Sequence, residues 1–107
     1  MPRYIIKLEH QEKEYYLEYS SVVDAPVTYG MNLKDFKRYY KERYGTNSIH
    51  DLKDRLKRVE KFGTSCFLDS NVDDTILCNR AGENGENISK DQLIKHFCVD
   101  NSFSYQD

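Results

Sequence analysis

The sequence predicts a small α+β domain in which an N-terminal antiparallel β-hairpin packs against two or three helices. Three observations support this fold class. The first twenty residues alternate between apolar and polar side chains, residues 32–63 hold two amphipathic segments with helix start and stop signals, and a third such segment begins at Ser89. At 107 residues, 38% of them hydrophobic, the chain suits one domain with one modest core. We therefore expect residues 1–107 to form a single domain, with 99–107 as a loosely ordered tail.

Two runs of alternating residues predict the strands of the hairpin, and the polar residues 10–13 predict its turn. The apolar positions are Tyr4, Ile6, Leu8, Tyr15, Leu17 and Tyr19. Because the positions between them are mostly charged, we expect the hairpin to be packed on one side only.

Residues 20–31 interrupt the alternation. Asp24-Ala25-Pro26 contains turn-forming residues, so the segment is predicted to be a loop, with a short strand at 22–23 or 27–28. The loop ends where a basic helix begins, and loops held by rigid elements often carry binding groups. A segment that only covers the core would have the same composition, so both interpretations stay open.

Two helices are predicted next. Asn32 is a favoured N-cap residue, and Gly45 is a natural C-terminal stop for the first helix. Ser48 is expected to cap the second helix, which ends before Gly63. The short connection between them makes the two helices neighbours.

The remainder of the chain is less regular. The apolar runs at 66–68 and 75–78 could be strands or helical turns, because periodicity does not decide at this length. Residues 79–87 are predicted to be a loop. Ser89 and Gln92 have the spacing of a capping box and predict the start of the last helix.

The charges of the chain are unevenly distributed. Residues 32–62 carry ten Lys or Arg and five Asp or Glu, a net charge of +5, whereas 1–31 and 63–107 carry −2 and −5. Cations attract phosphate, and tyrosine offers a stacking face to a base. The basic, tyrosine-bearing first helix therefore predicts a site for an anionic ligand such as a nucleotide or signalling nucleotide. The candidate residues are Lys37, Arg38, Lys41 and Arg43 for phosphate, and Tyr29, Tyr39, Tyr40 and Tyr44 for stacking.

The basic helices are also compatible with three alternative roles. Their cations could form a solvated face that pairs with local acids, such as Asp54 with Lys57 or Arg58. They could also bind an acidic protein, in which case the chain would be a protein–protein inhibitor with tyrosine and arginine anchors. A further alternative is a second copy of the chain, whose acidic flank would pair with the basic middle in a homo-oligomer.

A helix-turn-helix nucleic-acid binder is a third hypothesis for the function, but two features oppose it. Asp51 and Asp54 lie in the first turns of the second helix, where a recognition helix would meet bases and phosphates. The net charge of −2 argues against non-specific coating of DNA.

The sequence contains no recognisable catalytic or metal-binding constellation. Residues 69–73 begin like a calcium loop, but the sixth position is Asp74 instead of Gly and the twelfth is Arg80 instead of Glu. His96 and Cys98 lack the C-x-x-C or H-x-x-x-H spacing typical of zinc sites. We therefore predict a non-enzymatic binding protein with no cofactor.

Composition also bears on location. No apolar run approaches the ~18 residues of a membrane helix, and the first residues lack a signal-peptide core. The three cysteines are odd in number and widely spaced, which favours reduced thiols over a disulfide framework. We expect a cytoplasmic protein with no membrane partner.

Part of the chain resembles small accessory proteins encoded by tailed bacteriophages. The resemblance covers about the first 45 residues and is carried by Tyr15-Tyr16-Leu17-Glu18-Tyr19, the segment 20–31 and Phe36-Lys37-Arg38-Tyr39-Tyr40, with a weaker echo at Asn79-Arg80-Ala81-Gly82. It implies a binder that counteracts a host defence in the host cytoplasm, either by holding a host protein or by sequestering a nucleotide signal. It implies no site residues.

Overall fold

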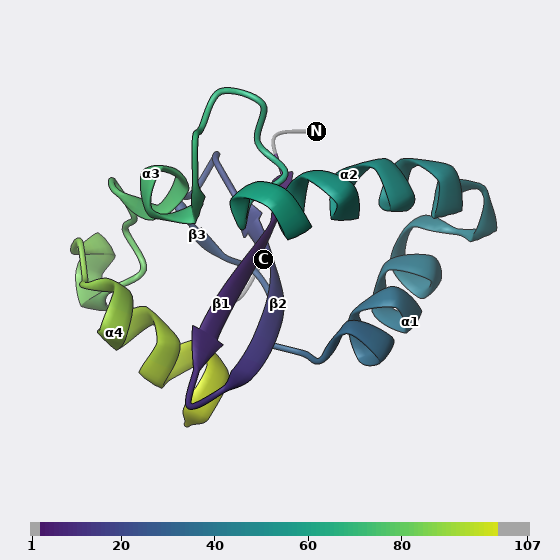
Figure 1. Cartoon of the computed structure of the whole chain (residues 1–107). Helices are drawn as coiled ribbons and strands as arrows, with labels where there is room; N and C mark the ends of the chain where they lie inside the picture. Colours follow the sequence, from purple (N-terminus) through teal and green to yellow (C-terminus); the bar gives the residue numbers. More distant parts are fainter. Residues whose placement is uncertain (1–2, 101–107) are drawn as a thin grey trace.

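The structure, a computed structural model, describes residues 3–100. A three-stranded antiparallel sheet in the order β1-β2-β3 runs through the middle, with helices on two sides (Figure 1). This arrangement confirms the predicted α+β class. The strands are β1 (Arg3–His10), β2 (Lys13–Ser20) and β3 (Ala25–Pro26), and the α-helices are α1 (Leu33–Tyr44), α2 (Ile49–Phe62), α3 (Val72–Ile76) and α4 (Lys90–Ile94).

The hairpin of β1 and β2 has the predicted turn. His10 pairs with Lys13, and the two residues between them, Gln11 and Glu12, have φ angles of 50° and 66°. Two-residue hairpin turns whose central residues both have positive φ match the twist of the strands that they connect. The turn therefore sets the register along the full length of the pair.

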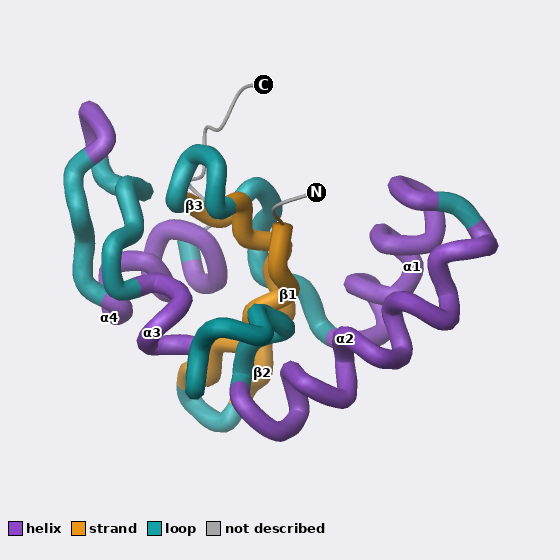
Figure 2. Tube along the Cα trace, turned by 90° about the horizontal axis from the view of Figure 1, so that it is seen from above, coloured by secondary structure: helices purple, strands orange, loops and turns teal. Residues whose placement is uncertain are grey.

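The hairpin is packed on both faces, so the prediction of one-sided packing is wrong. One face contributes Ile6 and Leu17 to a core shared with α3 and α4, and the other contributes Ile5 and Tyr16 to a second core with α1 and α2. Figure 2 shows the two helix pairs on opposite sides of the strands. The second face can be covered because its charges are neutralised by ion pairs. These pairs are Lys7 with Glu14 and Arg3 with Glu18, each at 2.9 Å.

The segment 20–31 lies along the outer edge of β2. Its strand is β3 at 25–26, and further on Tyr16 and Met31 exchange two backbone hydrogen bonds of 2.7 and 3.0 Å. The expected strand at 22–23 or 27–28 is therefore misplaced. Asp24 has a φ of 54° and ends a tight turn, which directs Val22 outward and brings the chain back beside β2.

The bounds of α1 and α2 agree with the prediction. Asn32 caps α1 by accepting a hydrogen bond of 2.8 Å from the Asp35 N–H, and Gly45 and Gly63 end the two helices at φ angles of 88° and 79°. Ser48 does not cap α2, contrary to the prediction. It belongs to a 3₁₀ turn that runs directly into the helix, so its backbone is already helical and its hydroxyl donates back to the Gly45 carbonyl.

The open question over 64–78 has a different answer for each of its two apolar runs: 66–68 form neither a helix nor a strand, and 75–78 begin inside a helix. Residues 66–68 form no strand, and Phe67 and Leu68 are 80% and 91% exposed, whereas 72–76 form α3. The capping box of Ser89 and Gln92 is confirmed, and a π-helical turn continues α4 to Val99. The expected loose tail lies, from residue 101 onward, outside the described residues.

Candidate binding groove between helices α1 and α2

One candidate site is a groove between α1 and α2, which diverge from their connecting turn (Figure 1). Its volume is about 620 Å³. Leu33, Leu52 and Leu56 are buried or half-buried, whereas the lysines of the groove are exposed, so the groove has an apolar floor and basic rims. The lining residues are Leu33, Ile49, Leu52 and Leu56 on the floor, Lys37, Lys41, Lys53 and Lys57 on the rims, and Ser48 and Glu60 at the ends.

Helical spacing explains how two amphipathic helices make a core and a groove at once. In α1, Phe36 and Tyr40 face the hairpin, while Leu33, Lys37 and Lys41 follow each other at four-residue intervals on the neighbouring stripe. In α2, Leu52 and Leu56 contribute to both the core and the groove, and Lys53 and Lys57 follow them along the groove side. Each helix therefore packs part of its apolar surface on the hairpin and directs a neighbouring lysine-bearing stripe along the groove.

The four rim lysines, Lys37, Lys41, Lys53 and Lys57, form no ion pair within residues 3–100. Local pairing of Asp54 with Lys57 or Arg58, the solvated-face alternative, is not formed in that part of the chain. The Arg58 Nε instead donates to the Ser65 carbonyl at 3.0 Å, and its guanidinium lies 3.8 Å from the centre of the Phe67 ring. The rims thus present four lysines that have no carboxylate within ion-pair distance in this part of the chain, although Glu60 also lines the groove.

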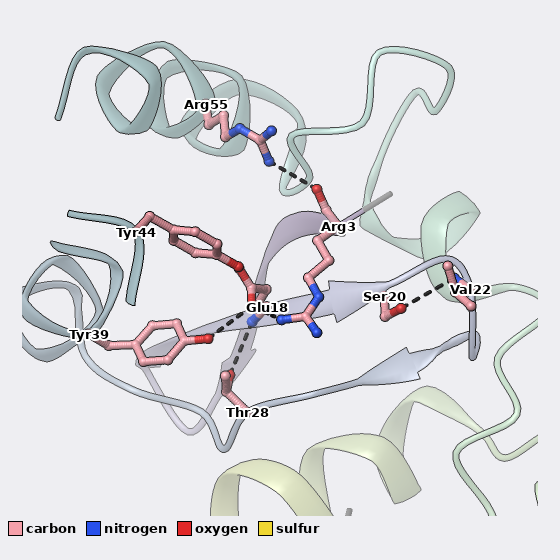
Figure 3. A network of polar contacts seen from close by, with 8 residues as sticks. All are labelled: Arg3, Glu18, Ser20, Val22, Thr28, Tyr39, Tyr44 and Arg55. Carbon is pink, nitrogen blue, oxygen red and sulfur yellow. Dashed lines mark hydrogen bonds and ion pairs between the residues drawn. The ribbon is translucent and has the colours of Figure 1, made fainter. Parts of the chain in front are cut away.

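The tyrosines of α1 point away from the groove. Tyr39 and Tyr44 both donate to the buried carboxylate of Glu18, which also accepts from Arg3 at 2.9 Å (Figure 3). Tyr40 donates to Asp51 at 3.0 Å. Burial, followed by the neighbouring Glu18, raises the pKa of Tyr39 and Tyr44 above the usual value, so both hydroxyls stay neutral and donate.

A smaller polar cavity of about 280 Å³ lies beside this network. Its charged groups already have partners within the protein. The Arg55 Nη1 donates to the Arg3 carbonyl at 2.9 Å. The Arg55 Nε lies 3.0 Å from the Asp51 carboxylate and forms an ion pair, without the alignment of a hydrogen bond. Glu18 and Asp51 both line the cavity and would repel a phosphate. The cavity is therefore a poor site for an anion.

The structure separates the predicted site residues into two groups. Lys37 and Lys41 line the groove, where they meet Lys53 and Lys57 of α2. Sequence reasoning did not include the α2 lysines in the site, although their four-residue spacing beside an apolar stripe was a usable signal. The other predicted residues lie outside the lining: Arg38 and Arg43 on α1, Tyr29 before it, and Tyr39, Tyr40 and Tyr44 toward the hairpin.

The histidine, cysteine and acidic side chains are the remaining candidates for metal or thiol chemistry. Within residues 3–100, no cluster of three or more His, Cys, Asp or Glu side chains could hold a metal ion. Cys66, Cys78 and Cys98 are all free, and burial raises the pKa of the Cys98 thiol to about 12. No helix in the same range is long and apolar enough to cross a membrane.

No protein-family model matches the chain, and no curated protein or solved structure is significantly similar to it. The geometry of the groove is therefore the basis on which its function is inferred.

Proposed function

We propose that this chain is a binding protein that holds an anionic, partly apolar partner in the groove between α1 and α2. The observation that carries the proposal is an aliphatic floor bordered by four lysines that have no ion-pair partner among residues 3–100. Burying the floor would contribute roughly 25 cal/mol for each Å² removed from water. A negatively charged partner would in addition neutralise the rims.

The geometry favours a protein partner over a nucleotide. The described lining of the groove contains no aromatic ring on which a base could stack. Three of the four tyrosines predicted to stack, Tyr39, Tyr40 and Tyr44, instead bond carboxylates on the side facing the hairpin. The protein–protein inhibitor is therefore the better supported hypothesis, and the resemblance to phage accessory proteins that hold a host protein is compatible with it.

The coarse proposal can be tested with 1-anilinonaphthalene-8-sulfonate, a small probe that combines a sulfonate with apolar rings. We expect its fluorescence to rise with the native protein and its binding to weaken roughly tenfold in Lys41→Glu/Lys53→Glu, since two surface charge contacts of up to ~1 kcal/mol each are reversed. The matched control is Lys34→Glu/Lys61→Glu, which makes the same charge change on the same two helices outside the lining. Equal weakening by both double variants, or no effect of either, would refute the groove as the site.

A further inference from the structure

We infer that the natural occupant of the groove is an amphipathic helix of another protein, with acidic residues on both sides of an apolar stripe. The inference rests on the proposed function and names the partner of the same site. It follows from the arrangement of the lysines, the shape of the floor and the hydrogen-bonding capacity of the walls.

The lysines are arranged as two matched pairs. Lys37 and Lys41 lie one turn apart on α1, and Lys53 and Lys57 lie one turn apart on α2, which places the members of each pair about 6 Å apart along their helix. Complementary charge must therefore occur on both flanks of the occupant and repeat at about one helical turn. Glu residues on the two sides of a helix satisfy this condition, whereas a fatty acid or a nucleotide carries its charge at one end.

The floor has the shape that receives a helix ridge. Ile49, Leu52 and Leu56 form a continuous apolar stripe along α2, and Leu33 of α1 completes the floor. Ile49 is 40% exposed although it is a large aliphatic residue in an amphipathic helix. Apolar side chains at i, i+3, i+4 and i+7 of a partner helix would cover such a stripe, as in other helix-in-groove complexes.

The walls disfavour an extended segment. Both walls are helices, whose backbone groups are bonded internally, and the Ser48 hydroxyl already donates to the Gly45 carbonyl. A strand laid on the aliphatic floor would leave backbone N–H and C=O groups buried without partners, which is unfavourable. A helix carries its backbone hydrogen bonds with it and avoids this cost.

The test uses fluorescein-labelled peptides of about 18 residues, long enough to span either helix of the groove. The first has a leucine stripe flanked on both sides by Glu, the second contains the same residues in scrambled order, and the third has Lys in place of every flanking Glu. We expect anisotropy to show the first peptide binding at least roughly tenfold more tightly than the scrambled one, and circular dichroism to show helix forming on binding.

The charge-reversed protein makes the test specific. The Lys41→Glu/Lys53→Glu variant should no longer bind the Glu-flanked peptide and should bind the Lys-flanked one. The Lys34→Glu/Lys61→Glu variant should bind the peptides as the unchanged chain does. Ile49→Asp should weaken both peptides by placing a charge on the floor.

Each remaining outcome has a defined meaning. If the sulfonate probe depends on the groove lysines but no peptide binds, the proposed function stands and the helix inference is overturned. If vesicles with roughly a third phosphatidylserine bind with the same lysine dependence and the peptides do not, the occupant is a lipid surface and the inference is again overturned. If light scattering shows a dimer that Lys41→Glu/Lys53→Glu dissociates, a second copy fills the groove and the foreign helix is refuted. If neither the probe nor any peptide responds to the lysines, both proposals fail.

Discussion

Replacing Glu18 by Gln should destabilise the protein by about 2–3 kcal/mol, because this carboxylate fastens α1 to the hairpin. Glu18 is 2% exposed and accepts hydrogen bonds from Arg3, Tyr39 and Tyr44. A hydrogen bond to a charged acceptor contributes about 1.5–3 kcal/mol, and breaking a buried ion pair costs about 3–5 kcal/mol. Glutamine keeps one acceptor oxygen, and the Arg3 side chain, 19% exposed, regains some hydration. The expected loss of stability is therefore smaller than the cost of about 3–5 kcal/mol for breaking a buried ion pair.

The measurement is urea unfolding of the Glu18→Gln variant, followed by circular dichroism. The midpoint should fall while the m-value stays unchanged, which attributes the effect to stability and not to a change in the surface exposed on unfolding. Glu9→Gln, the same chemical change at an exposed position on the neighbouring strand β1, should alter stability by less than about 0.5 kcal/mol. If Glu18→Gln were as mild as Glu9→Gln, the carboxylate would not hold α1, and the energetic role assigned to this network would be wrong.

Three further perturbations test other parts of the structure. The free energy of unfolding should not change with tyrosine ionisation below about pH 10 and should fall above it. Burial raises the folded-state pKa of several tyrosines above the unfolded value, so the unfolded chain loses these protons first and the contribution of the tyrosines to stability is lost as pH rises. Urea midpoints across alkaline pH, with tyrosinate absorbance, would check this, and a flat profile would contradict it. The tyrosines concerned are Tyr16, Tyr19, Tyr39, Tyr40 and Tyr44. Asn79→Ala should lower the free energy of unfolding by about 2–4 kcal/mol, because the buried Asn79 amide hydrogen-bonds both residue 76 and residue 88, just before α4. Thermal unfolding would measure this loss, with the exposed Asn47→Ala as the control. Gly30→Ala should cost about 1–3 kcal/mol, because a Cβ there would lie 2.8 Å from the Cys98 sulfur. Adding Cys98→Ala should restore part of that loss, and strict additivity of the two changes would argue against the clash.

Helix bounds could be predicted because they depend on chemistry within a few residues. Asn32 and Ser89 accept hydrogen bonds from N–H groups three residues ahead, and Gly45 and Gly63 adopt positive φ at the end of their helices. Such signals act inside one turn and are visible in the sequence. Ser48 failed as a cap because the preceding 3₁₀ turn, which no local signal indicated, had already made its backbone helical.

The two-sided packing of the hairpin depends on contacts between residues far apart in the chain. Glu18 and Lys7 looked like solvent-facing charges because their alternation with apolar residues was clear. Their neutralisation requires Arg3, Glu14 and the tyrosines of α1 to arrive at the same place in the fold. The groove has the same origin, since the meeting of the lysines of α1 with those of α2 follows from the angle between two helices and not from either sequence segment alone.

The tyrosines and the unpaired lysines could use the same carboxylates as partners. Three acids near the two helices accept from buried tyrosines: Glu18 from Tyr39 and Tyr44, Asp51 from Tyr40, and Glu60 from Tyr16. A buried hydroxyl needs an acceptor, so these three carboxylates bond tyrosines and pair with none of the groove lysines in the described part of the chain. Glu60 still lines the groove and offsets part of its positive charge, whereas Glu18 and Asp51 lie outside the lining. The tyrosines thus support the proposed anion binding indirectly, because the carboxylates that accept from them form no ion pair with the groove lysines among residues 3–100.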